Sequence, residues 1–218
     1  MKQKTRLGNL NLKYILIASL CLCLSSVKGQ ESKSISLEQL QSEMLVKTGD
    51  IVSVSCDFEQ NKHLQYLDAV VTSTGKLIFD KKNRLRWEYV DPFEYLIVIN
   101  NGIFSIKTDG RVSEYDIESN KMFSQISELI VSSVNGTIFT DPSFNVSAEQ
   151  NEKEYTVLMQ PKDEELKKVL SEIKLQIDKT NFSVNKVIMY EKEDNYTEIN
   201  FLNKKFNAQL AADTFACE

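Results

Sequence analysis

The sequence holds few of the residues on which enzyme active sites and metal sites depend. Its 218 residues include one histidine, seven glycines and four cysteines, and they contain no G-x-S-x-G, C-x-x-C, H-E-x-x-H, Walker or dinucleotide-binding motif. The histidine, His63, lies in a polar stretch after an expected strand, so we expect it in a surface loop and not as a general base. One histidine and dispersed cysteines do not form a zinc set. These shortages predict a protein that is not an enzyme and that uses no cofactor or metal ion.

The apolar run near the N-terminus is too short to cross a membrane. It extends from Tyr14 to Leu24, whereas a membrane-spanning helix needs about 20 apolar residues. Basic residues precede it and Val27-Lys28-Gly29 follows it, which is the pattern of a secretory signal peptide cleaved after Gly29. We therefore expect residues 1–29 to be a signal peptide and residues 30–218 to form one domain with a single hydrophobic core.

Positive charge is scarce once the expected signal peptide is removed. The whole chain has 26 basic and 31 acidic residues. The first 29 residues hold five of the basic residues and no acidic ones, which leaves 21 basic against 31 acidic residues and a net charge of −10. An acidic chain does not favour phosphate backbones or anionic lipid surfaces, so we expect no nucleic-acid partner.

The same cleavage leaves two cysteines, Cys56 and Cys217, in an oxidising compartment. They either form a bridge that ties the C-terminal tail to an early strand or remain two small buried hydrophobic residues. Spacing in the sequence does not show whether their Cα atoms are close enough, so both possibilities stay open.

Apolar and polar side chains alternate along most of the chain, which is typical of antiparallel strands with one buried face. The clearest case is the stretch from Gly75 to Gly102, in which Leu85, Trp87 and Tyr89 alternate with charged residues. We expect Trp87, at the centre of this stretch, to be buried. The strands that the alternation predicts span residues 51–58, 67–79, 84–89, 95–99, 103–107, 112–116, 144–148, 155–160, 173–178, 184–191 and 196–204.

Helical periodicity is limited to a few segments. The capping box at residues 36–39 opens a helix that ends near Gly49, and a second apolar stripe predicts a helix from Lys121 to Val134. The charged residues 161–170 predict one or two further helical turns. The stripe of the first helix consists of Leu37, Leu40, Met44 and Leu45. Together the elements predict a single α+β domain, in which one strongly curved antiparallel sheet of about eleven strands forms an incomplete β-barrel covered by two or three helices.

Two of the expected strands carry large apolar side chains on both faces. They include residues 95–99 and 187–190. Such strands are expected where helices cover a sheet or where its concave side encloses a cavity. A core filled by its own side chains and a cavity of lipid size both fit the pattern, and the sequence does not separate them.

Several short motifs follow one another in a fixed order after the first expected helix. They are Phe58-Glu59-Gln60, Gly75-Lys76-Leu77-Ile78-Phe79, Arg84-Leu85-Arg86-Trp87-Glu88-Tyr89, Pro92-Phe93 and Asn101-Gly102. Each is common by itself, but the ordered set behind a signal peptide resembles the LolA family, the periplasmic carriers of outer-membrane lipoproteins. The resemblance is sharpest from Phe58 to Gly102.

The resemblance implies an incomplete antiparallel barrel whose hydrophobic concavity is covered by helices. Carriers of this family take a triacylated lipoprotein from an inner-membrane ABC transporter, shield its acyl chains and pass it to an outer-membrane acceptor. Shielding is required because each CH₂ group exposed to water is unfavourable by about 0.8 kcal/mol. On this basis we expect a monomeric periplasmic carrier of acylated lipoproteins without a catalytic group.

The orientation of each side chain, inward or outward, that the periodicity of its element predicts selects the residues that we expect to line the cavity or its helical lid. These are Leu40, Met44, Phe58, Leu77, Phe79, Trp87, Ile97, Met122, Ile126 and Met189. One position departs from the family: where its members usually carry an Arg-Pro pair that latches the lid, this chain has Lys81-Lys82. Lysine offers a point charge where arginine offers a planar fork, so we expect the latch, and with it the cargo, to differ.

Other functions fit the same residues. A sensing module of the same fold would bind lipoproteins or polypeptides without transporting them. A carrier for another amphiphile, such as a lipid or pigment precursor, would use the same cavity. An enzyme would have to rely on His63.

Overall fold

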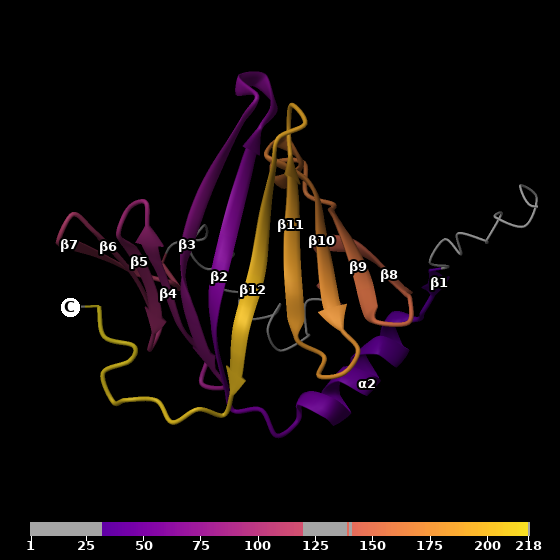
Figure 1. Ribbon diagram of the computed structural model, residues 1–218, viewed down its shortest axis with the longest axis horizontal. Coiled ribbons are helices and arrows are strands. Elements are labelled where there is room, and N and C mark those ends of the chain that lie inside the picture. Colours follow the sequence, from indigo (N-terminus) through magenta and orange to yellow (C-terminus); the bar gives the residue numbers. More distant parts are fainter. Residues whose placement is uncertain (1–31, 120–138, 140, 218) are drawn as a thin grey trace, which may run out of the picture. The chain divides into compact units, whose positions relative to one another are not determined.

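The computed structural model describes residues 32–119, 139 and 141–217. Within these ranges, twelve β-strands form one antiparallel sheet, accompanied by one α-helix, α2 (Leu37–Thr48), and two 3-10 turns, η2 (Gln65–Leu67) and η4 (Leu166–Lys168) (Figure 1). The strands are β1 (Lys33–Ser34), β2 (Ser53–Leu64), β3 (Ala69–Asp80), β4 (Arg84–Asp91), β5 (Tyr95–Asn100), β6 (Ile103–Thr108), β7 (Arg111–Asp116), β8 (Phe144–Gln150), β9 (Glu154–Pro161), β10 (Leu170–Asp178), β11 (Val184–Glu191) and β12 (Tyr196–Phe206).

The eleven strands expected from the alternation are present, and β1 is a short addition at one edge of the sheet. The strand order is β1-β8-β9-β10-β11-β12-β2-β3-β4-β5-β6-β7, so every pairing except β1 with β8 and β12 with β2 joins strands that follow one another in the sequence. β1 and β7 are the two edges, and the sheet is neither closed nor strongly curled. The expected single antiparallel sheet is confirmed, whereas its strong curvature into an incomplete barrel is not.

Helix α2 begins where its capping signal predicts. The Ser36 hydroxyl accepts a 3.1 Å hydrogen bond from the Gln39 backbone N–H, which satisfies one of the unpaired donors of the first turn. The Gln39 side chain donates to Glu43 instead of returning to the cap, so only half of the capping box forms. Leu40 and Met44 are buried as expected, whereas Leu45 is 60% exposed and does not belong to the packed stripe.

The apolar face of the sheet, which we call the inner face, carries two hydrophobic clusters. The first joins α2 to β8–β11 through side chains such as Leu40, Val157 and Leu175. The second spans β2–β6 and β12 around Phe58. Val187 and Met189 of β11 pack against both clusters, so the apolar inner face is continuous across the sheet.

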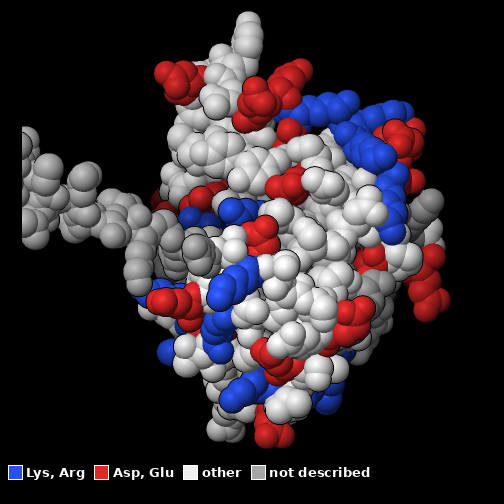
Figure 2. Space-filling view, turned by 90° about the vertical axis from the view of Figure 1, so that its right-hand side faces the viewer, with Lys and Arg blue, Asp and Glu red and all other residues white. Residues whose placement is uncertain are grey.

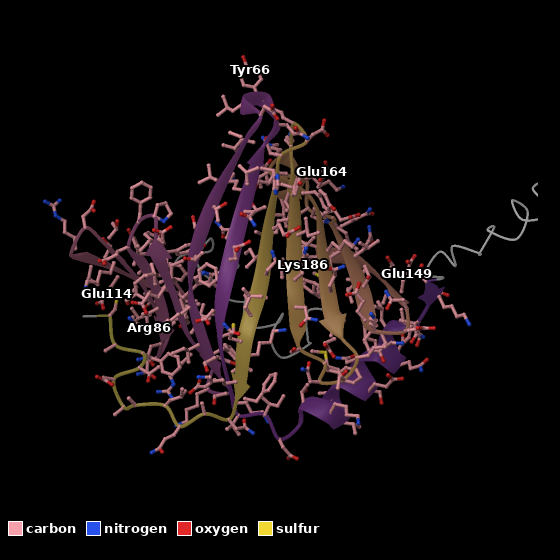
Figure 3. The ribbon with its side chains drawn as sticks, viewed as in Figure 1. Tyr66, Arg86, Glu114, Glu149, Glu164 and Lys186 are labelled. Atoms are coloured by element: carbon pink, nitrogen blue, oxygen red, sulfur yellow. The ribbon has the colours of Figure 1, made fainter. Side chains whose placement is uncertain are left out.

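The C-terminal tail explains why β5 is apolar on both faces. Ile97 and Ile99 face inward, whereas Leu96 and Val98 pack on the outer face against Phe215. Arg86 holds the tail in place by donating to the Ala216 carbonyl at 3.1 Å, and Figure 3 shows this arginine beside the tail. The second apolar face of β5 is therefore filled by protein, not by a cavity.

The two cysteines lie on opposite faces of the sheet. Cys56 is buried in the inner-face cluster around Phe58, whereas Cys217 packs in the outer-face cluster around Phe215. Both thiols are free. Of the two possibilities left open by the sequence, the structure therefore shows the unbridged one.

Two single residues differ from their expected surroundings. Trp87 is half-buried and not fully buried, because it lies at the margin of the inner-face cluster. His63 is part of β2 and not of a loop, and its ring stacks on Tyr196 with centroids 4.0 Å apart. The β2–β3 hairpin extends past this pair to Tyr66, which is 92% exposed at its tip (Figure 3).

The expected signal peptide and the helix at residues 121–134 lie outside the described residues. None of the helices within the described ranges is long and apolar enough to cross a membrane. On the face shown in Figure 2, lysine and arginine side chains are interspersed with aspartate and glutamate.

Candidate functional site

A cavity of about 270 Å³ lies between the C-terminal end of α2 and the inner face of the sheet. The wall of the cavity comes from five places: the end of α2, the segment that leads into β2, the ends of β2, β3, β11 and β12 that lie near α2, the turn between β3 and β4, and the turn between β10 and β11. These elements meet because β2 pairs with both β3 and β12 along its length. The cavity is therefore built around the central strands of the sheet.

The cavity wall is predominantly apolar. The end of α2 and the following segment contribute Met44, Leu45, Ile51 and Val52. The central strands contribute Val54, Cys56, Leu77, Phe79, Phe201 and Phe206. The turn between β10 and β11 adds Phe182, and the start of β11 adds Val184. Such a surface favours alkyl groups and offers few hydrogen-bonding partners to a polar ligand.

The structure brings three of the ten expected site residues to this cavity, namely Met44, Leu77 and Phe79. Leu40 and Phe58 are fully buried in the adjoining clusters and fill the core. Trp87, Ile97 and Met189 are half-buried on the inner face away from the cavity wall. Met122 and Ile126 lie outside the described residues.

The aromatic residues beside the cavity form a connected group on the inner face. The Phe58 ring lies edge-on to Trp87, with centroids 5.4 Å apart, and to Tyr89, with centroids 5.0 Å apart. The Tyr89 hydroxyl donates to Gln60 at 3.0 Å, whereas the buried indole N–H of Trp87 has no hydrogen-bond partner among the described residues. The apolar inner face thus continues past the cavity through partly exposed aromatic rings.

Two lysines, Lys81 and Lys204, line the predominantly apolar wall, and neither was among the site residues selected from the sequence. The Lys204 amine donates to the Ser183 hydroxyl at 3.0 Å and to the Asn185 amide oxygen. Burial lowers the pKa of Lys204, because the charged form loses hydration at this half-buried position. The nearby Cys56 thiol is buried as well, which raises its pKa to about 11 and keeps it protonated at neutral pH.

Lys81 occupies the position that the family resemblance assigns to the lid latch. It lies in the turn between β3 and β4, and its amine donates to the Gly49 carbonyl directly after α2. A cation at a helix C-terminus is favourable because the exposed carbonyls carry partial negative charge. Lys81 therefore connects the sheet to the end of α2 by a single point contact.

The cavity has few ionisable groups in its wall. Its ionisable lining groups within the described residues are the two lysines and the protonated Cys56 thiol, with no carboxylate or histidine beside them. Among the same residues, no three histidine, cysteine or carboxylate side chains gather where they could hold a metal ion.

Two of the solved structures similar to this chain have TM-scores above 0.5, which shows a shared fold at low sequence identity. An uncharacterized conserved protein from Thermus thermophilus has a TM-score of 0.52 at 7% identity, covering 83% of this chain and 93% of that chain. MucB has a TM-score of 0.51 at 10% identity, covering 84% of this chain and 62% of MucB, so this chain spans less than two thirds of MucB. A LolA superfamily protein from Nitrosomonas europaea has a TM-score of 0.44 at 9% identity, covering 84% and 98% of the two chains.

The sequence itself identifies the family. No curated protein matches the chain. The family described as "Outer membrane lipoprotein carrier protein LolA" matches residues 50–218, which is well over half of the chain and includes eleven of the twelve described strands. The chain therefore belongs to the LolA family.

Proposed function

We propose that this protein is a periplasmic carrier that shields the acyl chains of lipoproteins and moves them from the inner to the outer membrane. The observation that carries the proposal is the apolar cavity between α2 and the inner face of the sheet. Membership of the LolA family supports the same assignment. The partners would be acylated lipoproteins, an inner-membrane ABC transporter and an outer-membrane acceptor, with the carrier itself monomeric.

The size of the cavity determines what it holds without rearrangement. Its volume of about 270 Å³ is less than twice that of a cavity of about 150 Å³ that accommodates benzene. It therefore accepts part of one acyl chain, and a larger cargo would need α2 to move.

The packing of α2 makes such a movement feasible. Only Leu40 and Met44 of this helix are buried, and burying one such side chain stabilises by about 1.5–3 kcal/mol. A 16-carbon acyl chain that left water would gain about 12 kcal/mol at about 0.8 kcal/mol per CH₂ group. Cargo binding therefore offsets displacement of the helix. This energetic balance supports α2 as a lid.

The release of acylated proteins from spheroplasts tests the proposal. Purified protein is incubated with spheroplasts, and acylated proteins in the soluble fraction are quantified. Val54→Trp fills the cavity, because Val54 is a half-buried wall residue, and should abolish release. Leu202→Trp places the same side chain at an exposed position on β12 and should leave release unchanged. Release by the folded Val54→Trp variant at the wild-type level, or no release by the wild type, would contradict the proposal.

The small volume also favours a second candidate, a carrier for an amphiphile with a single acyl chain. The cavity would hold part of the single chain of such a cargo, so this cargo would require less displacement of α2 than three acyl chains would. Direct binding of single-chain and triacylated ligands to the purified protein distinguishes the two candidates.

A further inference from the structure

A β-bulge directs Lys204 into the cavity. Phe201 faces inward opposite Phe58, so regular alternation would also turn Lys205 inward and Lys204 outward. The register of β12 against β2 shifts between Leu202 and Lys205, and Asn203 has a left-handed backbone with φ of 52°. The shift reverses the parity, so that Lys204 lines the cavity. Bulges are frequent beside functional sites because they re-aim a side chain in this way.

The Lys204 amine has neutral partners and a remaining donor. An ammonium group has three N–H donors, and its hydrogen bonds to Ser183 and Asn185 use two of them. Among the described residues Lys204 forms no ion pair within 4.0 Å. Asp178 acts on it from farther away, and its carboxylate accepts the Thr180 N–H at 2.6 Å. A half-buried cation without a counter-ion is unfavourable, and an incoming anion would remove that cost.

The charge of the cavity wall is of one sign, although acidic residues outnumber basic ones in the chain. Lys81 is the second cation of the wall, and no aspartate or glutamate contributes to it within the described residues. Alkyl groups would contact the apolar wall, while a negative group would be drawn to the Lys204 corner. The combination matches a molecule with one hydrocarbon chain and one anionic end.

We infer that Lys204, together with Ser183 and Asn185, binds the anionic end of a single-chain amphiphile, such as the carboxylate of a fatty acid, whose hydrocarbon chain lies in the cavity. This inference rests on the proposed function as an acyl-chain carrier and specifies the cargo class of its cavity. Ser183 and Asn185 position the lysine amine, and the third N–H of the amine donates to the carboxylate.

Displacement of an apolar fluorescent dye measures the binding. Dodecanoate and dodecanol have the same chain and differ at the polar end. The wild type should bind dodecanoate about tenfold or more tightly than dodecanol, because a hydrogen bond to a charged partner contributes more than one to a neutral partner. Lys204→Gln should remove this preference while leaving dodecanol binding unchanged, and Lys204→Arg should retain it. Lys205→Gln, at the exposed neighbouring position, is the matched control and should behave as the wild type.

Three results would overturn the inference and leave the carrier function standing. The first is equal binding of acid and alcohol by the wild type. The second is an equal loss of both ligands in a Lys204→Gln variant whose thermal unfolding is unchanged, because that loss indicates a structural role. The third is binding of a triacylated lipopeptide but of neither dodecyl ligand. Failure of all three ligands to bind would reject both the inference and the carrier function.

Discussion

The Tyr155 hydroxyl on β9 donates a 2.5 Å hydrogen bond to the Glu43 carboxylate on α2. This bond connects the helix to the sheet. It lowers the pKa of Glu43, because the carboxylate gains a donor that stabilises its charged form. Burial, followed by the same bond, raises the pKa of Tyr155 to about 12.

Tyr155→Phe should therefore destabilise the fold in a pH-dependent way. At pH 7 we expect a loss of about 1–2 kcal/mol, because the hydrogen bond to a charged acceptor is removed. The folded pKa of Glu43 lies below its ordinary value of 4.5, so the charged bond contributes fully above that value and its contribution is lost as the pH falls through the folded pKa. Urea unfolding at pH 7 and pH 3 measures the difference. Tyr66→Phe, at the exposed hairpin tip, is the control. An equal loss at both pH values would contradict the assignment.

Gly75→Ala should destabilise strongly, because the site has no room for a side chain. A Cβ atom on Gly75 would lie 2.0 Å from the Glu88 carbonyl oxygen and 2.6 Å from Cζ of Phe58. We expect a loss of about 3 kcal/mol, at the upper end of the range for overpacking. Gly49→Ala is the matched control, because that residue has right-handed helical dihedrals and its Cβ would come no closer to another atom than 3.2 Å, to the Leu45 carbonyl oxygen. Equal stability of the two variants in thermal unfolding would refute the prediction.

Phe215→Ala should uncover the outer face of β5. The ring is 3% exposed, packs on Leu96 and Val98, and lies 4.3 Å from the Arg84 guanidinium carbon. Removal of a buried phenylalanine side chain destabilises by about 3–5 kcal/mol. Phe93→Ala removes the same side chain where it is 79% exposed and should change the free energy of unfolding by less than about 0.5 kcal/mol. Similar unfolding midpoints in urea for both variants would show that the tail does not support the sheet.

Thiol labelling should distinguish Cys56 from Cys217. We expect Cys217, which is half-exposed, to react with a maleimide in the native protein at pH 8. Cys56 is buried and its pKa is raised to about 11, so it should react only after unfolding. Mass spectrometry of Cys56→Ser and Cys217→Ser variants assigns each label. Absence of both thiols in the unfolded, unreduced protein would reveal a disulfide and contradict the structure.

The strands could be predicted from the sequence because one face of each is apolar and the period of two survives in the pattern. The ends of the strands were harder to predict from the sequence. β2 continues past Phe58 through a polar stretch to Leu64, because backbone pairing with β3 and β12 holds residues that have no hydrophobic signal. The weak curvature of the sheet was not predicted, since twist and curvature depend on contacts that alternation does not encode.

The candidate site was only partly predictable for a similar reason. Parity correctly placed Leu77 and Phe79 on the face that carries the cavity, because β3 is regular at that point. The same rule misplaces Lys204, since the bulge at Asn203 adds a residue that the pattern cannot reveal. The covering of β5 by the C-terminal tail could not be predicted from the sequence either, because Phe215 lies in an irregular segment without a periodic pattern.

The pairing of β2 with β12 joins residues 53–64 to residues 196–206. Strands β2 to β7 and strands β8 to β12 each pair in sequence order, so their hairpins can form locally. The pairing of β2 with β12 can form only after β12 has been synthesised. Contacts between such remote segments slow folding. One edge of β2 therefore keeps its backbone N–H and C=O groups unpaired until β12 has been synthesised.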